Sequence, residues 1–329
     1  MPPKMIAFEG GLHMNTLKSV IAAAALTVSA VAQAATLTPV INAFTLTDLQ
    51  EQGAVKVLEI RSDPDAFAKA HIPGAVHIPY GEFRGPKGNP GALPELKALA
   101  KTLGSRGFTP EDTVVVVHDG VTTSDFGAAA RVYWTLKSVG FTELAILNGG
   151  FRAYQKDGFE VSSIATQVQP VEVALSFNPA WYADTDSVAA RVDAGEGASL
   201  IDARLDAFFA GKAWHGAAAK PGILPGATHF SFEAFFDKNS PLLKDQAEIK
   251  SIAAAEGLDQ PSTVSYCNTG HWAATNWFVL SEVAQVEDVR LYAASMVEWS
   301  NADRPMENVP SSLEFAILKT QKWFNGLVN

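Results

Sequence analysis

The feature that most constrains this chain is an internal repeat. Residues 58–61 (LEIR) are matched by 201–204 (IDAR), and residues 71–75 (HIPGA) by 223–227 (ILPGA), about 150 residues later in the chain. Two further matches keep the same order, namely 114–120 with 263–267 and 147–151 with 291–295. Four features that recur in one order at nearly one offset indicate that the chain is two copies of a single domain.

Each copy alternates runs typical of buried strands with runs typical of helices. In the first copy we expect strands at 56–60, 113–118 and 144–147, with helices at 63–70, 94–103 and 126–139. In the second copy we expect strands at 200–202, 263–266 and 289–291, with helices at 245–256 and 273–283. This alternation predicts an α/β fold in which a parallel sheet is covered on both faces and ligands bind at the carboxyl ends of its strands.

The 329 residues therefore divide into two domains and shorter flanking segments. We predict a first domain at 40–160, a linker at 161–179 that contains Pro170 and Pro179, and a second domain at 180–310. We expect residues 311–329 to form a tail helix that packs on the surface through Phe315, Leu318 and Trp323.

Residues 14–34 have the three parts of a secretory signal. Lys18 supplies the basic region, residues 20–31 the apolar region, and Ala32-Gln33-Ala34 a small-residue cleavage site. The alternative is an ordinary N-terminal helix, and either Met1 or Met14 suits a start. With cleavage after Ala34, the mature protein is expected to be periplasmic or secreted, with no membrane segment. A net charge of −10 makes nucleic acid and anionic membrane surfaces unsuitable partners.

Cys267 is the only cysteine of the chain and stands between an expected strand and an expected helix. Free backbone N–H groups and the positive end of a helix dipole at such a place stabilise a thiolate. The alternative is a small buried hydrophobic residue. A single cysteine cannot form an internal disulfide, so in an oxidising compartment Cys267 is either a reactive thiol or a partner in an intermolecular disulfide.

With these motifs, the chain resembles the tandem rhodanese family of sulfurtransferases. The resemblance also rests on residues 144–151 (LAILNGGF), 202–204 (DAR) and 295–299 (SMVEW). It implies two tandem rhodanese-like domains, each a parallel sheet flanked by helices. It further implies that the second domain carries the catalytic Cys267, whereas the first is a non-catalytic copy with an acidic residue, Asp119, at the corresponding place.

The resemblance also implies the chemistry. Cys267 takes a sulfane sulfur from a small anionic donor, thiosulfate or 3-mercaptopyruvate, holds it as a persulfide, and passes it to a thiophilic acceptor such as cyanide or a thiol. This ping-pong transfer needs one thiolate and neither a metal nor another cofactor. The N–H groups of the following loop are expected to cradle the persulfide, and its residues are Asn268, Thr269, Gly270, His271 and Trp272.

Two further side chains bear on the donor. The resemblance implies that Arg204 binds the donor's anionic group, while the alternative is a structural ion pair with Asp202. His271 is interpreted either as a titratable cation or as an exposed loop residue. Phe208 stands where a second basic residue is often found in the family, so we expect thiosulfate to be preferred over 3-mercaptopyruvate.

Cys267 could also serve other functions. A cysteine phosphatase needs an arginine six residues after the cysteine, but Ala273 stands there and the next arginine is Arg290. A non-catalytic persulfide carrier and an intermolecular disulfide are both compatible with Cys267.

Overall fold

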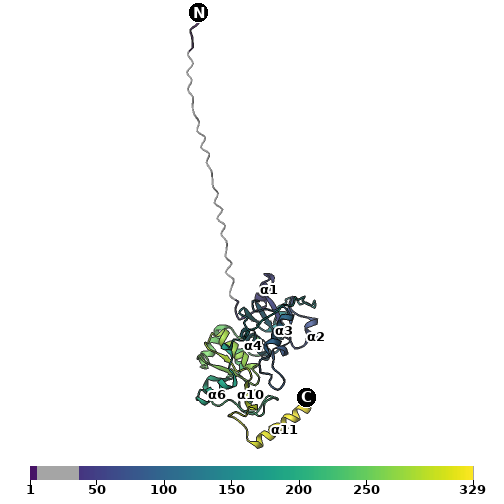
Figure 1. Ribbon diagram of the computed structural model, residues 1–329, viewed down its shortest axis with the longest axis vertical. Helices are drawn as coiled ribbons and strands as arrows, with labels where there is room; N and C mark the ends of the chain where they lie inside the picture. Colours follow the sequence, from purple (N-terminus) through teal and green to yellow (C-terminus); the bar gives the residue numbers. More distant parts are fainter. Residues whose placement is uncertain (6–36, 329) are drawn as a thin grey trace. The chain divides into compact units, whose positions relative to one another are not determined.

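The structure is a computed structural model that describes residues 1–5 and 37–328 (Figure 1). The chain separates into a short unit, Met1–Thr36, and a compact unit, Leu37–Asn329. The signal segment expected at 14–34 lies outside the described residues.

The first domain is built on a parallel sheet of five strands in the order β1-β5-β4-β2-β3. The strands are β1 (Val40–Ile41), β2 (Lys56–Glu59), β3 (Val76–His77), β4 (Val114–Val117) and β5 (Leu144–Leu147). All four residues of the central strand β4 are valines with no exposed surface. Such a strand is stable only when helices cover both faces of the sheet.

The second domain repeats this sheet with four strands in the order β7-β6-β8-β9. The strands are β6 (Leu200–Asp202), β7 (Thr228–His229), β8 (Val264–Tyr266) and β9 (Arg290–Leu291). The partner that corresponds to β1 is reduced to an isolated parallel bridge between Tyr182 and Leu291. The tandem α/β architecture predicted from the repeat is therefore confirmed, with both sheets parallel.

The helices follow the predicted alternation. Those of the first domain are α1 (Ala43–Glu51), α2 (Pro64–Lys69), η1 (Tyr80–Phe83), α3 (Leu96–Ser105), α4 (Thr123–Ser138) and α5 (Gly150–Lys156). Those that follow are η2 (Pro179–Trp181), α6 (Thr185–Asp193), η3 (Gly197–Ser199), α7 (Asp206–Phe209), η4 (Phe232–Phe235), α8 (Gln246–Ala255), α9 (Trp272–Phe278), the π-helical η5 (Val279–Val283), α10 (Ser295–Asn301) and α11 (Ser312–Val328).

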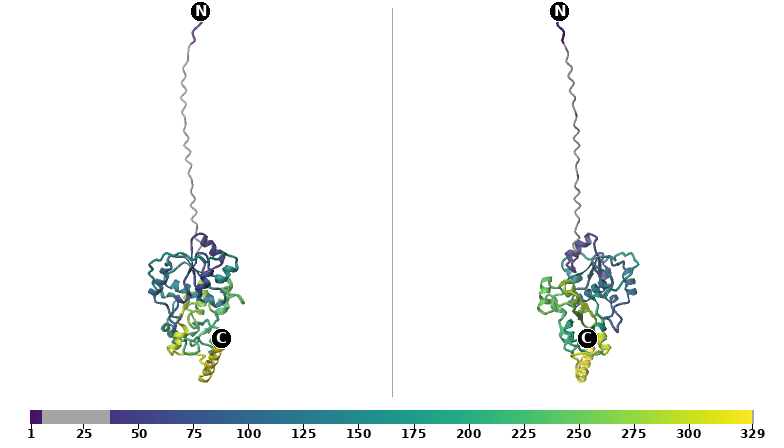
Figure 2. Two further views of the ribbon diagram at one scale, coloured as in Figure 1. Left: turned by 90° about the vertical axis from the view of Figure 1, so that its right-hand side faces the viewer. Right: turned by 60° about the vertical axis from the view of Figure 1, so that its left-hand side comes forward.

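The cores show why the sheets are buried on both sides. Along β4, Val114 and Val116 pack into one apolar cluster and Val115 and Val117 into another, as the two-residue period of a strand requires. The first of these clusters continues across both domains, because α4 packs along α9. In both views of Figure 2, the purple-to-blue first domain and the green-to-yellow second domain occupy different parts of the unit.

Two helices begin earlier than the sequence predicts. Helix α4 starts at Thr123 instead of Phe126, because Asp125 accepts hydrogen bonds from the backbone N–H groups of Val121 and Thr122 and so fixes an extra first turn. Helix α9 starts at Trp272 and changes to π-helical geometry at Val279.

The segments outside the two sheets agree in part with expectation. Between α5 and η2 the chain forms no helix or strand apart from a bridge between Ser162 and His71, and the domain boundaries remain a prediction. The tail helix α11 is present, and the ring of Phe315 packs edge-on against Trp214 at 5.3 Å. Trp323 remains 61% exposed, so the helix packs through Phe315 and Leu318 more than through that tryptophan.

Candidate active site

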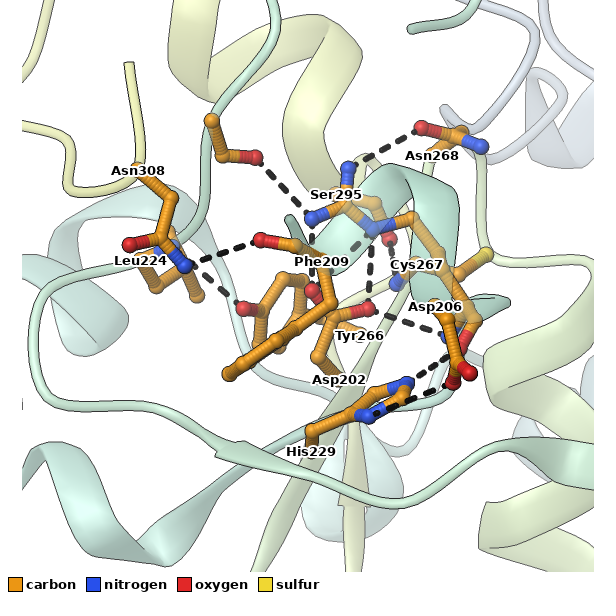
Figure 3. A network of polar contacts seen from close by, with 12 residues as sticks. Asp202, Asp206, Phe209, Leu224, His229, Tyr266, Cys267, Asn268, Ser295 and Asn308 are labelled. Carbon is orange, nitrogen blue, oxygen red and sulfur yellow. Dashed lines mark hydrogen bonds and ion pairs between the residues drawn. The ribbon is translucent and has the colours of Figure 1, made fainter. Parts of the chain in front are cut away.

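Cys267 directly follows β8, at the carboxyl end of the second sheet, and is 1% exposed. Its N–H group donates to Oγ of Ser295 at 3.1 Å (Figure 3). Its carbonyl oxygen accepts from the N–H of Met296 at 3.1 Å. Ser295 has a positive φ of 54° and donates its hydroxyl to the carbonyl of Tyr292 at 2.6 Å. The start of α10 therefore fixes the backbone of the cysteine.

The loop after Cys267 is held by its carbonyl groups. The carbonyl of Asn268 accepts from Val297 N–H at 3.0 Å, and that of Thr269 accepts from Arg84 Nη2 at 2.8 Å. The carbonyl of Gly270 accepts from Arg131 Nη1 at 3.4 Å. Four successive carbonyls, 267 to 270, are thus turned toward α10 or toward the first domain.

The N–H groups of the same loop are free. Among the described residues, no acceptor is found for the backbone N–H of Asn268, Thr269, Gly270, His271 or Trp272. Because the C=O and N–H of a trans peptide point in opposite directions, the N–H groups of residues 268–271 face away from the elements that hold carbonyls 267–270. Successive free N–H groups beside a cysteine are suited to holding an anion, as the sequence predicts for this loop.

Arg204 forms the ion pair that the sequence left open as the alternative to donor binding. Its Nε and Nη2 donate to both carboxylate oxygens of Asp202, at 2.8 and 2.5 Å, and its Nη2 also donates to the carbonyl of Gly222 at 2.9 Å. Burial alone would lower the pKa of Arg204, but Asp202 more than offsets this and the pKa is raised. Nη1 of Arg204 also donates to Oδ1 of Asn268 at 3.3 Å, so the ion pair of Arg204 and Asp202 helps to hold the loop through the Asn268 side chain.

His271 is not the cation that one interpretation of the sequence assigned to it. Nε2 lies 2.9 Å from the carbonyl of Ser124, to which it must donate, and Nδ1 therefore accepts from the Tyr80 hydroxyl at 2.9 Å. Burial lowers the pKa of His271 to about 4, and the positive charge of Arg84 acts in the same direction. The interpretation was wrong because residues of the first domain, distant in sequence, set the charge of this ring.

Trp272 faces the first domain as well. Its Nε1 donates to Oγ of Ser124 at 2.8 Å, and its ring stacks on Phe232 with centroids 5.2 Å apart. Trp272 is thus a wall of the site, as is Phe208, which meets the Trp272 ring edge-on at 5.6 Å.

The first domain contains the counterpart of this site, and the residue that replaces the cysteine is His118. Val117 pairs with Glu59 across β4 and β2 as Tyr266 pairs with Asp202 across β8 and β6, so the next residues, His118 and Cys267, correspond. Asp119, which the resemblance placed opposite Cys267, corresponds instead to Asn268. The backbone N–H of Arg152 donates to the carbonyl of Asp119 as the N–H of Val297 does to that of Asn268. The two copies therefore align one residue away from the alignment that the resemblance implies.

The counterpart loop of the first domain is filled by its own acid. Oδ2 of Asp125 accepts from the N–H groups of Val121 at 2.8 Å and Thr122 at 2.9 Å. Asp125 is the third residue of α4, and the third residue of α9 is Ala274. These N–H groups therefore have a built-in acceptor in the first domain, whereas the corresponding N–H groups of the second domain are left free.

Four residues of the first domain reach this loop, and none of them is among the site residues predicted from the sequence. Arg84, Arg131, Tyr80 and Ser124 all contact residues 269–272. One signal was present, since Arg131 is a lone charge in the otherwise apolar run 126–136, FGAAARVYWTL.

Among residues 1–5 and 37–328, no group of three or more histidine, cysteine, aspartate or glutamate residues is placed to hold a metal ion. In the same part of the chain, no helix is long and apolar enough to span a membrane.

Comparison with known proteins gives two matches to one family. The family described as "Rhodanese-like domain" matches residues 43–157 and again residues 184–302. A protein of Synechococcus elongatus named "Putative thiosulfate sulfurtransferase" is 30% identical over 266 residues, which cover 78% of this chain and 81% of the relative. A protein of Mycobacterium bovis named "Putative thiosulfate sulfurtransferase 1" is 28% identical over 75% of this chain and 89% of the relative.

Among solved structures, an anaerobic ergothioneine biosynthesis enzyme from Chlorobium limicola superposes with a TM-score of 0.71. The match is 21% identical and covers 82% of this chain and 70% of that one. At this identity the likeness concerns the fold.

Proposed function

This chain belongs to the rhodanese-like domain family, in tandem, and from that membership and its geometry we propose that it is a sulfurtransferase acting through a persulfide of Cys267. The observation that carries the proposal is the loop after the cysteine. The carbonyls of residues 267–270 are held by α10 and by the first domain, and the successive N–H groups that follow the cysteine are left free. Preorganised donors of this kind stabilise charge that develops during the reaction.

The proposed reaction has two half-reactions, each a displacement at sulfur. The thiolate of Cys267 attacks the outer sulfur of thiosulfate, the S–S bond of the donor breaks, and sulfite leaves with the bonding electron pair. The acceptor, cyanide or a thiolate, then attacks the terminal sulfur of the persulfide and regenerates the Cys267 thiolate. The free N–H groups of residues 268–272 would stabilise the anion in both states.

We propose thiosulfate rather than 3-mercaptopyruvate as the preferred donor. The names of the curated relatives point to thiosulfate. Arg204 is neutralised by Asp202, and Phe208 lies with its ring 5.9 Å from the Arg204 guanidinium where a second cation would be needed for a carboxylate. A compact sulfur oxyanion can instead be held by the loop.

The proposal extends to location. The secretory features of residues 14–34 suggest that the mature protein works in the periplasm or outside the cell. A single thiol there has no internal disulfide partner, and its burial at 1% exposure disfavours a standing intermolecular disulfide.

The test is the Cys267→Ser variant, with Asp119→Asn, next to the first-domain counterpart of Cys267, as its control. We expect Cys267→Ser to lose sulfite release from thiosulfate with cyanide as acceptor, and Asp119→Asn to keep it, because only the second domain carries a nucleophile. Retained turnover in a folded Cys267→Ser protein would refute the mechanism. A non-catalytic carrier would instead gain the mass of one sulfur atom, as measured by mass spectrometry, and would show no turnover when acceptor is added.

A further inference from the structure

Two arginines of the first domain lie against the loop that follows Cys267. Arg131, on α4, donates from Nη1 to the carbonyls of Thr269 and Gly270 at 3.5 and 3.4 Å, and from Nη2 to the carbonyl of Gly91 at 2.8 Å. Arg84 donates from Nη2 to the carbonyl of Thr269 at 2.8 Å. The fit is close, because a Cβ on Gly270, whose φ is +67°, would lie 2.5 Å from Nη1 of Arg131.

Neither arginine has an acidic side chain as its partner in the part of the chain that the structure describes. No carboxylate of the described chain forms an ion pair with Arg84 or Arg131. Arg131 has no exposed surface, and its Nε and the Nη1 of Arg84 are buried without a hydrogen-bond partner. A buried cation that lacks an anion is costly unless one arrives from elsewhere.

The electrostatics of Arg131 point to Cys267 as a group whose negative charge it can balance. A negative charge on Cys267 raises the pKa of Tyr80 on η1, of Arg131 on α4 and of Arg204 after β6. Asp202 neutralises Arg204, and burial raises the pKa of Tyr80, so that its phenol remains neutral. Burial, and then the charge of Arg84, lowers the pKa of Arg131 to about 9, while Cys267 acts in the opposite direction.

We infer that Arg131, supported by Arg84, is a positioning residue of the sulfur-transfer site and supplies the positive charge that the Cys267 thiolate and persulfide neutralise. The inference rests on the proposed function. The two guanidinium groups would hold the carbonyls of Thr269 and Gly270, and thereby keep the N–H groups of Gly270 and His271 turned to the other side. The first domain, which has no nucleophile, would thus be a working part of the active site.

The experiment measures the rate of persulfide formation on Cys267 from thiosulfate as a function of pH, by the mass gain of one sulfur atom in a single turnover. The variants are Arg131→Met, which removes charge and hydrogen bonds; Arg131→Lys, which keeps the charge and loses the forked geometry; and Arg84→Met. Arg106→Met, at an exposed arginine of the first domain, is the matched control.

We expect Arg131→Met to form the persulfide at least tenfold more slowly at neutral pH, with the rise of the rate moved up by about one pH unit, as loss of a nearby positive charge requires. Arg131→Lys should keep the wild-type pH profile at a reduced rate. Arg84→Met should shift the pH profile less than Arg131→Met does, and Arg106→Met should match wild type.

The outcomes separate the two hypotheses. If wild type forms the persulfide and Arg131→Met follows the wild-type pH profile and rate, the inference is overturned and the proposed function stands. If the pH profile of Arg131→Lys shifts as far as that of Arg131→Met, the positive charge of Arg131 has no effect on the reaction, and the inference that it balances the Cys267 thiolate fails. If wild type forms no persulfide from thiosulfate, the proposed function itself is wrong, and the role of the arginines falls with it.

Discussion

Ala274→Asp should convert the open loop of the second domain into the closed loop of the first. In the first domain, Asp125 at the third position of α4 binds the N–H groups of Val121 and Thr122. Ala274 is the third residue of α9, and the corresponding N–H groups of Gly270 and His271 have no acceptor in the described chain. An aspartate at 274 would place a built-in anion where the donor's anion has to bind.

The size of the effect follows from those two hydrogen bonds. A hydrogen bond to a charged group contributes about 1.5–3 kcal/mol, so two bonds give about 3–6 kcal/mol that an incoming anion must displace. At 1.4 kcal/mol per factor of ten, kcat/KM for thiosulfate should fall by about 10²- to 10⁴-fold. Stability should change far less, because the cost of burying a charge at Ala274, which has no exposed surface, is opposed by the new hydrogen bonds at the start of α9.

The assay is kcat/KM for thiosulfate with cyanide as acceptor, together with the midpoint of thermal unfolding. Ala274→Asn is the control, since it has nearly the same shape as aspartate and no charge, and it should lose much less activity. Equal losses in the two variants would show that size and not charge is responsible. A folded Ala274→Asp protein with wild-type kcat/KM would refute the view that these N–H groups bind the anion.

Two further predictions concern other parts of the chain. His118 is 1% exposed, and burial lowers its pKa to about 4 against an opposing effect of Asp125. Because the pKa in the folded protein lies below the unfolded value of about 6.5, unfolding takes up a proton between about pH 6.5 and 4. The free energy of unfolding should therefore fall by about 3 kcal/mol as pH falls through that window. His118→Gln should show a smaller loss over the same range in urea unfolding at several pH values, and an unchanged slope would contradict the assignment. Protein recovered from its native host should begin after Ala34 by N-terminal sequencing, whereas an intact Met1 would count against export.

The sequence alone determined the fold, because the information lies in local patterns. A repeated order of motifs, a run of four valines in β4 and the alternation of strand and helix do not depend on distant contacts. The place of Cys267 at the carboxyl end of a strand follows from the same local pattern, as does the absence of an arginine six residues later.

Local sequence patterns could not show how the two copies align at the site. Only the pairing of Val117 with Glu59 and of Tyr266 with Asp202 shows that His118, and not Asp119, stands opposite Cys267. In a parallel sheet the register is fixed by hydrogen bonds between strands that are far apart in sequence, and a shift of one residue cannot be seen in the sequence itself.

The charges of the site were decided by tertiary structure for a similar reason. The sequence gives His271 and Arg204 as candidate cations, but the first domain makes His271 a neutral hydrogen-bonding ring through Tyr80 and Ser124, and Asp202 neutralises Arg204. Arg84 and Arg131 contact the loop without a carboxylate partner among the residues that the structure describes. Arg131 stands 136 residues before Cys267 in the chain and reaches its loop because α4 packs along α9. Burial and charge pairing are properties of the folded neighbourhood, so the residue types alone could not assign them.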